Sequence, residues 1–374
     1  MQALVLEADK KLVHVTGRPV PPPPDGDDGR PLASALVRIA ACGICGSDIP
    51  RGFGGKAYHY PLVMGHELSG VIEEAAPGGR LPAGTRVTVF PLLPENAASD
   101  PACQTGDHAQ AAAYDYYGSR RDGAFAEYLR VPEWNLFPVP DDVNLLHAAM
   151  TEPAAVALHG VRRLHCKAGD DAAVFGAGPI GNLAAQWLRI HGCSRVFVVD
   201  VDERKLDIAG KMNFGAAPLN AARLDPVAAI LDATGGRGVQ RSVEACGLPL
   251  TFLQAIKVAA RSGEVLFMGN IAGEFRIGEK DFSGILRKEL SIYGTWNSKV
   301  VPHGADDWST VLKHLDRTLH VAPLITDRLP LAEGPRVFDD IVHRRGFHNK
   351  VIFDISPADT TGAAAAAGTG TTES

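Results

Sequence analysis

The sequence predicts an α/β fold in which a doubly wound parallel sheet is inserted into a β-rich domain. The 374 residues exceed what one hydrophobic core usually holds, so two domains are expected. Residues 1–157 carry short β-type runs separated by turn residues, and residues 297–356 add a helix and a closing strand to them. Residues 158–296 alternate strand and helix patterns, which is typical of a parallel sheet. A substrate is expected in the cleft between the two domains.

The individual elements follow from the same patterns. In the β-rich part, strands are expected near residues 1–7, 36–40, 70–75 and 85–91, and the Pro-rich segment 19–30 is expected to be an exposed connection. In the inserted part, strands are expected around Val174, Val196, Ser242, Val265 and Ile292, with helices over 182–190, 204–213, 226–234 and 250–259. A helix over 305–315 and a strand over 350–355 follow, and the Ala-, Gly- and Thr-rich tail 357–374 is expected to be disordered.

Composition excludes several classes of protein. Hydrophobic residues make up 45% and charged residues 21%, as in ordinary globular proteins, and the net charge of −6 provides no basic surface for nucleic acid. No apolar run approaches the roughly 20 residues of a bilayer span, and the first residues form a strand pattern instead of a signal peptide. Six cysteines in a chain of this length do not indicate a disulfide framework, so the cytoplasm is the expected location.

A glycine-rich run between a strand and a helix predicts dinucleotide binding. In the sequence Phe-Gly-Ala-Gly-Pro-Ile-Gly, Gly176 permits the tight turn, Gly178 lets the backbone approach a pyrophosphate, and Gly181 lets helix and strand pack closely. Pro179 and Ile180 open the helix whose N-terminus would hold the pyrophosphate.

An acid at the end of the next strand predicts which dinucleotide binds. Asp200 follows the glycines at about the 20 residues that the fingerprint expects. A carboxylate there accepts hydrogen bonds from the ribose hydroxyls of NAD and repels the 2′-phosphate of NADP. Arg204 is the one nearby group that weakens this preference, so NAD is favoured.

Four further residues predict a catalytic metal site. Cys45, His66 and Glu152 offer a thiolate, an imidazole and a carboxylate, the ligands of a three-coordinate zinc site with an open fourth position, and Glu67 adjoins His66. Each also has an ordinary interpretation, because a cysteine or histidine is common in a core and a glutamate is common on a surface.

The motifs together resemble a known superfamily. Cys-Gly-Ile-Cys-Gly-Ser-Asp at 42–48, Gly-His-Glu at 65–67 and the glycine run are similar to those of the zinc-dependent medium-chain dehydrogenases. Segments 45–51, 114–123 and 286–290 resemble the polyol dehydrogenase branch, and within it the galactitol-1-phosphate 5-dehydrogenases. The resemblance implies a GroES-like catalytic domain with an inserted Rossmann domain.

The resemblance also implies roles for single residues. Cys45, His66 and Glu152 match the catalytic zinc ligands, which implies one bound zinc ion. Glu67 matches a carboxylate beside the metal that can exchange with a ligand or water, and Ser47 matches a hydroxyl that passes a proton from the alcohol.

The chain departs from the superfamily at two places. The stretch 91–115 holds one cysteine, Cys103, where many relatives have four that bind a structural zinc, so that zinc is expected to be absent and the lobe to be mobile or held by a neighbouring subunit. Pro50 replaces a histidine of the usual proton relay. Asp48 is expected to accept a hydrogen bond from His66.

These inferences predict an NAD-dependent enzyme that interconverts a secondary alcohol and a ketone by hydride transfer. The substrate would be a polyol, a sugar phosphate or a cyclitol. An Ala-rich composition is typical of a GC-rich genome, in which a cyclitol or aminocyclitol of secondary metabolism is an alternative to a hexitol phosphate. A non-catalytic NAD(H)-binding sensor or structural protein is the alternative of another class.

Substrate contacts and assembly are the least specific predictions. Tyr58, Tyr117, Arg120, Trp296 and Asn297 are candidates for the substrate pocket, although such aromatic and charged residues are also common in packing and on surfaces. Residues near 265–268 and in the 280s and 290s are expected near a sheet edge that pairs two subunits, in a homodimer or homotetramer.

Overall fold

The computed structural model describes residues 1–26, 29–212, 214–301 and 306–361. Contacts divide the chain into two compact units. Unit 1 contains Met1–Glu152, Lys299–Asp316 and the described residues from Ile325 onward, and unit 2 contains Pro153–Ser298 and Arg317–Leu324. The first boundary lies a few residues before the expected position, and unit 2 includes a short return segment that the sequence pattern did not indicate.

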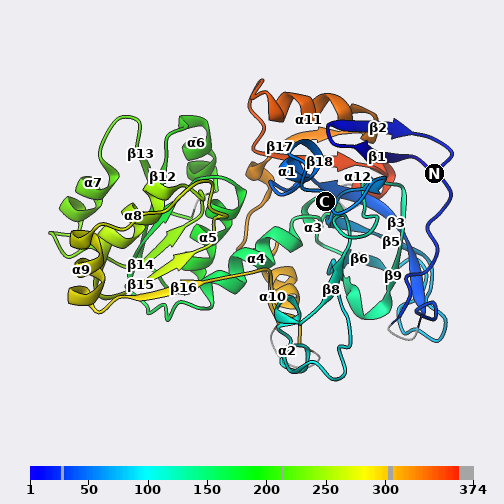
Figure 1. Cartoon of the computed structure of the whole chain (residues 1–374), viewed down its shortest axis with the longest axis horizontal. Helices are drawn as coiled ribbons and strands as arrows, with labels where there is room; N and C mark the ends of the chain where they lie inside the picture. Colours follow the sequence, from blue (N-terminus) through cyan, green and yellow to red (C-terminus); the bar gives the residue numbers. More distant parts are fainter. Residues whose placement is uncertain (27–28, 213, 302–305, 362–374) are drawn as a thin grey trace, which may run out of the picture. The chain divides into compact units, whose positions relative to one another are not determined.

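Unit 1 is mostly β-structure (Figure 1). Its strands are β1 (Ala3–Ala8), β2 (Lys11–Val15), β3 (Ser34–Gly43), β4 (Leu62–Val63), β5 (Glu67–Glu74), β6 (Arg86–Val89), β7 (Leu92–Pro94), β8 (Tyr114–Tyr116), β9 (Tyr128–Pro132), β10 (Leu136–Pro138), β17 (Ile325–Leu329) and β18 (Lys350–Asp354). Its helices are α1 (Asp48–Phe53), α2 (Pro101–Gln104), α3 (Leu145–Ala148), α10 (Asp307–His314), α11 (Gly334–Val342) and α12 (Pro357–Thr361), with 3-10 turns η1 (His108–Gln110), η2 (Glu133–Asn135) and η4 (Leu331–Glu333). Helix α4 (Thr151–Val161) crosses the boundary.

The main sheet of unit 1 brings distant segments together. Its order is β10-β6-β5-β3-β18-β17, and β9 also pairs with β3. Gly43 at the end of β3 is opposite Glu67 on one side and Ile352 on the other. Smaller sheets are β2-β1-β4 and β7-β8. The aromatic rings of Phe125, Phe338 and Phe353 pack edge to face in the core of this unit.

Unit 2 is a parallel sheet with the strand order β13-β12-β11-β14-β15-β16. The strands are β11 (Asp171–Phe175), β12 (Arg195–Asp200), β13 (Ala216–Asn220), β14 (Val239–Glu244), β15 (Ala259–Phe267) and β16 (Ser291–Gly294). The helices are α5 (Pro179–Ile190), α6 (Glu203–Lys211), α7 (Pro226–Ala233), α8 (Pro249–Val258) and α9 (Glu279–Lys288), with the 3-10 turn η3 (Ala322–Leu324). The doubly wound sheet predicted from the alternation is confirmed, and the helices flank it in Figure 1.

Two elements of unit 2 were not predicted, and each has a physical reason. Strand β13 is a partly exposed edge strand that contains Pro218, so it lacks the apolar run of a central strand. Helix α9 has no buried residue, so its sequence carries a weak core signal. Strand β15 lies one strand inside the sheet edge, which is formed by β16.

The prediction of a disordered tail is wrong for its first residues. Residues 357–361 form α12, because Thr360 is buried and its hydroxyl donates to Asp354 at 3.0 Å, while Asp359 pairs with Arg38. The rest of that prediction, residues 362–374, lies outside the described residues.

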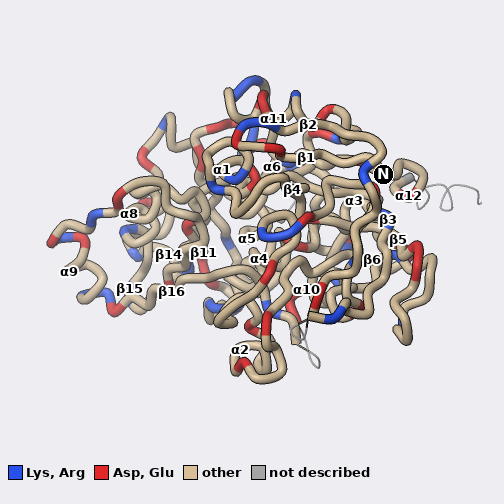
Figure 2. The backbone as a smooth tube through the Cα atoms, turned by 45° about the vertical axis from the view of Figure 1, so that its right-hand side comes forward, with Lys and Arg blue, Asp and Glu red and all other residues tan. Residues whose placement is uncertain are grey.

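In the described part of the chain, no helix is long and apolar enough to cross a membrane. Figure 2 shows Lys and Arg interspersed with Asp and Glu along the backbone. This mixed pattern agrees with a net charge of −6 and provides no basic stripe for a phosphate backbone.

Candidate metal centre and cofactor site

The structure brings Cys45, His66 and Glu67 together in unit 1, with one ligand atom of each within 4.8 Å of the others. Cys45 follows β3 and Glu67 begins β5, so the pairing of these two strands places them side by side. Gly43 is required here, because a Cβ at this position would collide with the Glu67 carboxylate. Gly65 precedes His66 with φ = 93°, a turn that favours glycine.

The cluster is buried and rich in acidic groups. His66 is 3% exposed, Glu67 1% and Glu152 6%. Burial, followed by the negative charges of Glu67 and Asp48, raises the pKa of the Cys45 thiol to about 12. Burial also raises the pKa of Glu152 to about 7, although His66 opposes the shift. A bound cation would offset the burial of these acidic groups and favour the Cys45 thiolate, and a Cys, His and carboxylate donor set fits zinc.

His66 has one nitrogen without a hydrogen bond. Its Nδ1 is buried and unpartnered, 3.7 Å from Asp48 Oδ1, so the expected hydrogen bond to Asp48 is not formed. Asp48 instead accepts from the Cys45 amide at 3.0 Å and from Arg51 Nη1 at 2.6 Å.

Glu152 lies beside this cluster but is not one of its three mutually close residues. Its Oε1 accepts a hydrogen bond from the Tyr116 hydroxyl at 3.1 Å, and the Tyr116 ring packs edge-on against His66 with centroids 5.6 Å apart. Tyr116 thus contacts two predicted ligands. Sequence reasoning missed it, because an aromatic residue in a Tyr-rich segment carries no signal of a polar partner.

Lys350 is the second residue that sequence reasoning missed. Its ammonium group donates to Glu67 Oε2 and to the Ile44 carbonyl at 2.9 Å, and both charged side chains are almost fully buried. Burial lowers the pKa of Lys350, but the charges of Glu67 and Cys45 outweigh it, so the net shift is upward. A signal was present, because Lys350 begins a strand in which every residue is buried, and a buried lysine needs an anionic partner.

Ser47 contacts the candidate metal cluster. The Ser47 hydroxyl donates to Cys45 Sγ at 3.3 Å.

The substrate candidates of unit 1 differ in exposure. Tyr58 is 66% exposed, and the Arg120 guanidinium lies 5.1 Å from its ring centroid and 4.3 Å from that of Tyr114. The candidate Tyr117 is a core residue instead: it is 2% exposed and its hydroxyl donates to the Arg130 carbonyl, so burial keeps it from a substrate.

Trp296 and Asn297 follow β16 in unit 2. The Trp296 side chain is exposed, and Asn297 adopts φ = 58° while its Oδ1 accepts from the Ser298 amide at 2.8 Å. Both residues therefore present polar or aromatic groups near the carboxyl end of the sheet.

The glycine turn of unit 2 has the geometry that the fingerprint requires. Gly176 adopts φ = 111°, and a Cβ at Gly181 would collide with the Gly176 carbonyl oxygen. A Cβ at Gly178 would meet no atom within 4 Å, so the backbone is open to a ligand there. Helix α5 begins at Pro179, with Ile180 in its first turn, and its free N–H groups adjoin this opening.

Asp200 supports the same turn from the next strand. Its Oδ2 accepts the Ala177 amide at 2.8 Å, and its Oδ1 accepts the amides of Val201 and Asp202. Arg204 forms two hydrogen bonds to Asp202, at 2.9 and 2.7 Å. Because its guanidinium is paired with Asp202, Arg204 is less available to bind a 2′-phosphate.

The lobe 91–115 is held by contacts within its own chain. Asp100 caps α2 and accepts the amides of Ala102 and Ala112 at 2.8 and 3.0 Å. His108 Nε2 is 3.1 Å from the Val300 carbonyl oxygen. These contacts tie the lobe to itself and to the segment around Val300.

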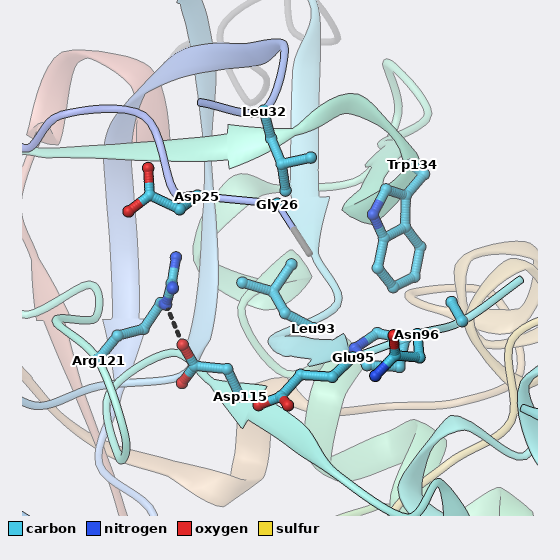
Figure 3. Close-up of a pocket in the computed structure, with 11 residues that line it drawn as sticks. Asp25, Gly26, Leu32, Leu93, Glu95, Asn96, Asp115, Arg121 and Trp134 are labelled. Carbon is cyan, nitrogen blue, oxygen red and sulfur yellow. Dashed lines mark hydrogen bonds and ion pairs between the residues drawn. The ribbon is translucent and has the colours of Figure 1, made fainter. Parts of the chain in front are cut away.

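A pocket of about 480 Å³ borders this lobe, apart from the metal cluster. Figure 3 shows Arg121 paired with Asp115 on one wall and Trp134 on the opposite side. Its lining is Asp25, Gly26, Leu32, Leu93, Pro94, Glu95, Asn96, Ala97, Asp115, Arg121 and Trp134. None of the predicted metal or cofactor residues lines it.

Comparison with known proteins identifies the family. Residues 32–141 match the alcohol dehydrogenase GroES-like domain family, and residues 179–317 match the zinc-binding dehydrogenase family. Galactitol 1-phosphate 5-dehydrogenase of Escherichia coli K12 is 34% identical over 322 residues, which cover 84% of this chain and 91% of that protein.

Solved structures give the same result. The crystal structure of galactitol-1-phosphate dehydrogenase from Escherichia coli superposes with a TM-score of 0.84 at 32% identity, covering 95% of this chain and 100% of the other. A protein from Sinorhizobium meliloti, described as a zinc-binding dehydrogenase bound to NADP, has a TM-score of 0.82 at 28% identity, with 94% and 98% covered. The chain therefore belongs to the zinc-dependent medium-chain dehydrogenases, with a GroES-like domain and a Rossmann domain.

Proposed function

We propose that this protein is an NAD-dependent, zinc-dependent dehydrogenase that interconverts a secondary alcohol of a polyol, sugar phosphate or cyclitol and the corresponding ketone. The observation that supports it most is the buried cluster of Cys45, His66 and Glu67 in a chain whose other unit carries an open glycine turn. A non-catalytic NAD(H) sensor would not need an intact set of zinc ligands.

The residues of the cluster would have different roles in the reaction. Cys45 and His66 would hold the zinc with Glu67 or Glu152 as the carboxylate ligand. Bound zinc supplies a Lewis acid that lowers the pKa of an alcohol. Ser47, 3.3 Å from the Cys45 sulfur, is placed to accept the alcohol proton, since Pro50 has no group that can carry one. Lys350 would pair with the Glu67 carboxylate and orient it.

The zinc assignment is tested by ligand substitution. Cys45→Ser and His66→Ala should lower the zinc content and reduce NADH formation at least 1,000-fold, because the Lewis acid is lost. NADH binding, measured by fluorescence titration, should stay within about threefold, because the cofactor turn lies in another unit. Cys103→Ser is the matched thiol control and should retain zinc and turnover. Full turnover by either ligand variant would refute zinc catalysis.

The preference for NAD is a separate proposal. The Asp200 carboxylate and its neighbour Asp202 would repel a 2′-phosphate, while Arg204 is paired. We expect kcat/KM for NAD to exceed that for NADP by at least tenfold. Equal values would contradict the role of Asp200, and the NADP-bound relative from Sinorhizobium meliloti makes this comparison necessary.

The substrate class is tested with a panel of candidate alcohols and NAD, with the formation of NADH followed by its absorbance. The panel contains galactitol 1-phosphate, L-idonate, 2,3-butanediol and neutral cyclitols, chosen from the names of the relatives and from the cyclitol alternative. If phosphate is recognised, Arg120→Gln should raise KM for the phosphorylated substrate about tenfold with little change in kcat. Turnover of neutral cyclitols alone would contradict a phosphate-binding role of Arg120. If no alcohol is turned over, the alternative of a non-catalytic NAD(H) sensor is favoured.

A further inference from the structure

A buried asparagine is bonded to the glycine turn of unit 2. Asn182 is the fourth residue of α5 and is 0% exposed. Its Nδ2 donates to the Ala177 carbonyl oxygen at 2.6 Å. Ala177 precedes Gly178, the N-cap of α5, and the side chain at the fourth helical position is the one that can reach back to it. That contact is commonly apolar, whereas here it is a hydrogen bond.

The two peptide groups on either side of Ala177 are each held by one side chain. The Ala177 N–H donates to Asp200 Oδ2 at 2.8 Å, and Asp200 ends the neighbouring strand β12. The Ala177 carbonyl accepts from Asn182. Asp200 therefore fixes the peptide before Ala177, and Asn182 fixes the peptide after it.

The second of these peptides carries a free donor. The bond between Ala177 and Gly178 is trans, so its carbonyl and its N–H point in opposite directions. Because Asn182 holds the carbonyl, the Gly178 N–H is directed away from Asn182, and it makes no hydrogen bond to the described residues. A Cβ on Gly178 would meet no atom within 4 Å, so a ligand can approach here. A free N–H at an open helix N-terminus is a donor for a phosphate oxygen.

Packing alone does not explain an amide at this position. The Asn182 Oδ1 is buried without a hydrogen-bond partner, which costs stability. A leucine has a side chain branched at the same atom and would not bury an unpaired acceptor. The hydrogen bond to Ala177 is the one contribution that the amide makes and a leucine cannot.

We propose that Asn182 is a positioning residue for the dinucleotide, which acts through the Ala177 carbonyl to direct the Gly178 N–H toward the pyrophosphate. The inference rests on the proposed function in that the ligand is NAD(H). Asp200 would accept from the ribose and also holds the preceding peptide. One short network thus fixes the acceptor for the ribose and the donor for the pyrophosphate relative to each other.

The test measures ligand binding to the zinc-loaded, full-length protein. In Asn182→Leu the dissociation constants of ADP, measured by calorimetry, and of NADH, measured by fluorescence titration, should rise about tenfold, as expected when one hydrogen bond to a charged group is lost. The affinity for adenosine, which has no phosphate, should not change. KM for NAD should rise by a similar factor while kcat is unchanged.

The stability of the same variant separates positioning from packing. Asn182→Leu loses the bond to Ala177 but also removes the unpaired Oδ1, so the two effects offset each other and the thermal midpoint should stay within about 3 °C of the parent. Asn182→Ala has no side chain that could clash with the turn and should show the same losses of affinity. A loss of affinity for adenosine equal to that for ADP would indicate a general disturbance and overturn the proposal.

Gln186→Leu is the matched control on the same helix. Gln186 is 1% exposed, and its amide bonds both backbone groups of His320. This variant should lose stability but keep the parent's affinity for ADP. Unchanged ADP affinity in both Asn182 variants would overturn the positioning role, and so would a parent that does not bind ADP. A parent that binds ADP but oxidises no alcohol would contradict the proposed function and leave this inference standing.

Discussion

Single polar contacts decide how the carboxylates of the metal cluster are used. Glu67 is bound by the buried ammonium of Lys350, and Glu152 accepts from the Tyr116 hydroxyl. Each contact orients one oxygen of a carboxylate that would otherwise be buried without a partner. The choice between Glu67 and Glu152 as the zinc ligand therefore depends on Lys350 and Tyr116, which were outside the predicted set.

Removing the Tyr116 hydroxyl should weaken zinc binding. In Tyr116→Phe the ring still packs on His66, but Glu152 loses the group that orients it. We expect the zinc dissociation constant, measured by competition with a chromogenic chelator, to rise about tenfold. Tyr117→Phe is the neighbouring control: its buried hydroxyl donates to the Arg130 carbonyl and is not part of the cluster, so zinc affinity should not change. Equal losses in both variants would indicate a general packing effect.

Removing the Lys350 charge should destabilise the zinc-free protein. Lys350→Met leaves Glu67 as a buried, unpaired carboxylate, which costs about 3–5 kcal/mol of unfolding free energy. Urea unfolding of the zinc-free protein measures this loss. The double variant Lys350→Met, Glu67→Gln should recover most of it, because no charge remains to be paired. A double variant as unstable as the single one would show that the lysine stem, and not its charge, stabilises the site.

At the level of elements, hydrogen bonds within the chain hold the lobe 91–115. Asp100 accepts amides from both α2 and the returning strand segment, and Lys299 pairs with Asp107 at 2.8 Å. Backbone hydrogen bonds to the carboxylate lower the pKa of Asp100. The group therefore stabilises the lobe at neutral pH, and that stabilisation decreases in acid as the carboxylate protonates.

Loss of this carboxylate should loosen the lobe. Asp100→Ala removes the acceptor for the amides of α2 and Ala112, so limited proteolysis within 95–112 should become several-fold faster. Asp100→Asn retains one acceptor oxygen, so its rate of proteolysis should lie between those of the parent and of Asp100→Ala. Zinc content, measured by atomic emission, should remain one ion per chain in all three proteins. Two ions per parent chain would show that the lobe holds metal after all.

For the whole molecule, the edge of the unit 2 sheet is the expected assembly surface. Among the described residues, β16 is the last strand of this sheet, and the helix before it in the chain, α9, exposes Phe282 and Leu286, which are 54% and 64% exposed. Exposed apolar side chains beside a free strand edge favour pairing with a second copy. We expect this surface to take part in the homodimer or homotetramer that the family resemblance implies.

Charge on this surface should prevent the pairing. The double variant Phe282→Glu, Leu286→Glu should halve the mass measured by light scattering after size-exclusion chromatography, because two charges would be buried at the interface. Leu224→Glu, on an exposed residue beyond β13, is the control and should keep the parent mass. If the parent is a monomer, the edge-pairing proposal is wrong.

Local patterns predicted most of the fold. The alternation in 158–296 and the strands at the start of the chain are confirmed, because their apolar periodicity reflects burial directly. Strand β13 and helix α9 were missed where burial is partial, and α12 was missed because its few anchoring contacts involve residues far away in the sequence.

The sequence by itself determined the class of this protein: the glycine turn with Asp200, and the motifs that carry Cys45 and His66, are local and have few alternative explanations. Only the tertiary structure decided which side chains complete the metal cluster. Glu67 meets Lys350 because β5 and β18 both lie beside β3, and Glu152 at the start of α4 meets Tyr116 at the end of β8. Such contacts arise from strand order and packing. The contacting residues therefore do not occur at a fixed spacing in the sequence from which they could be recognised.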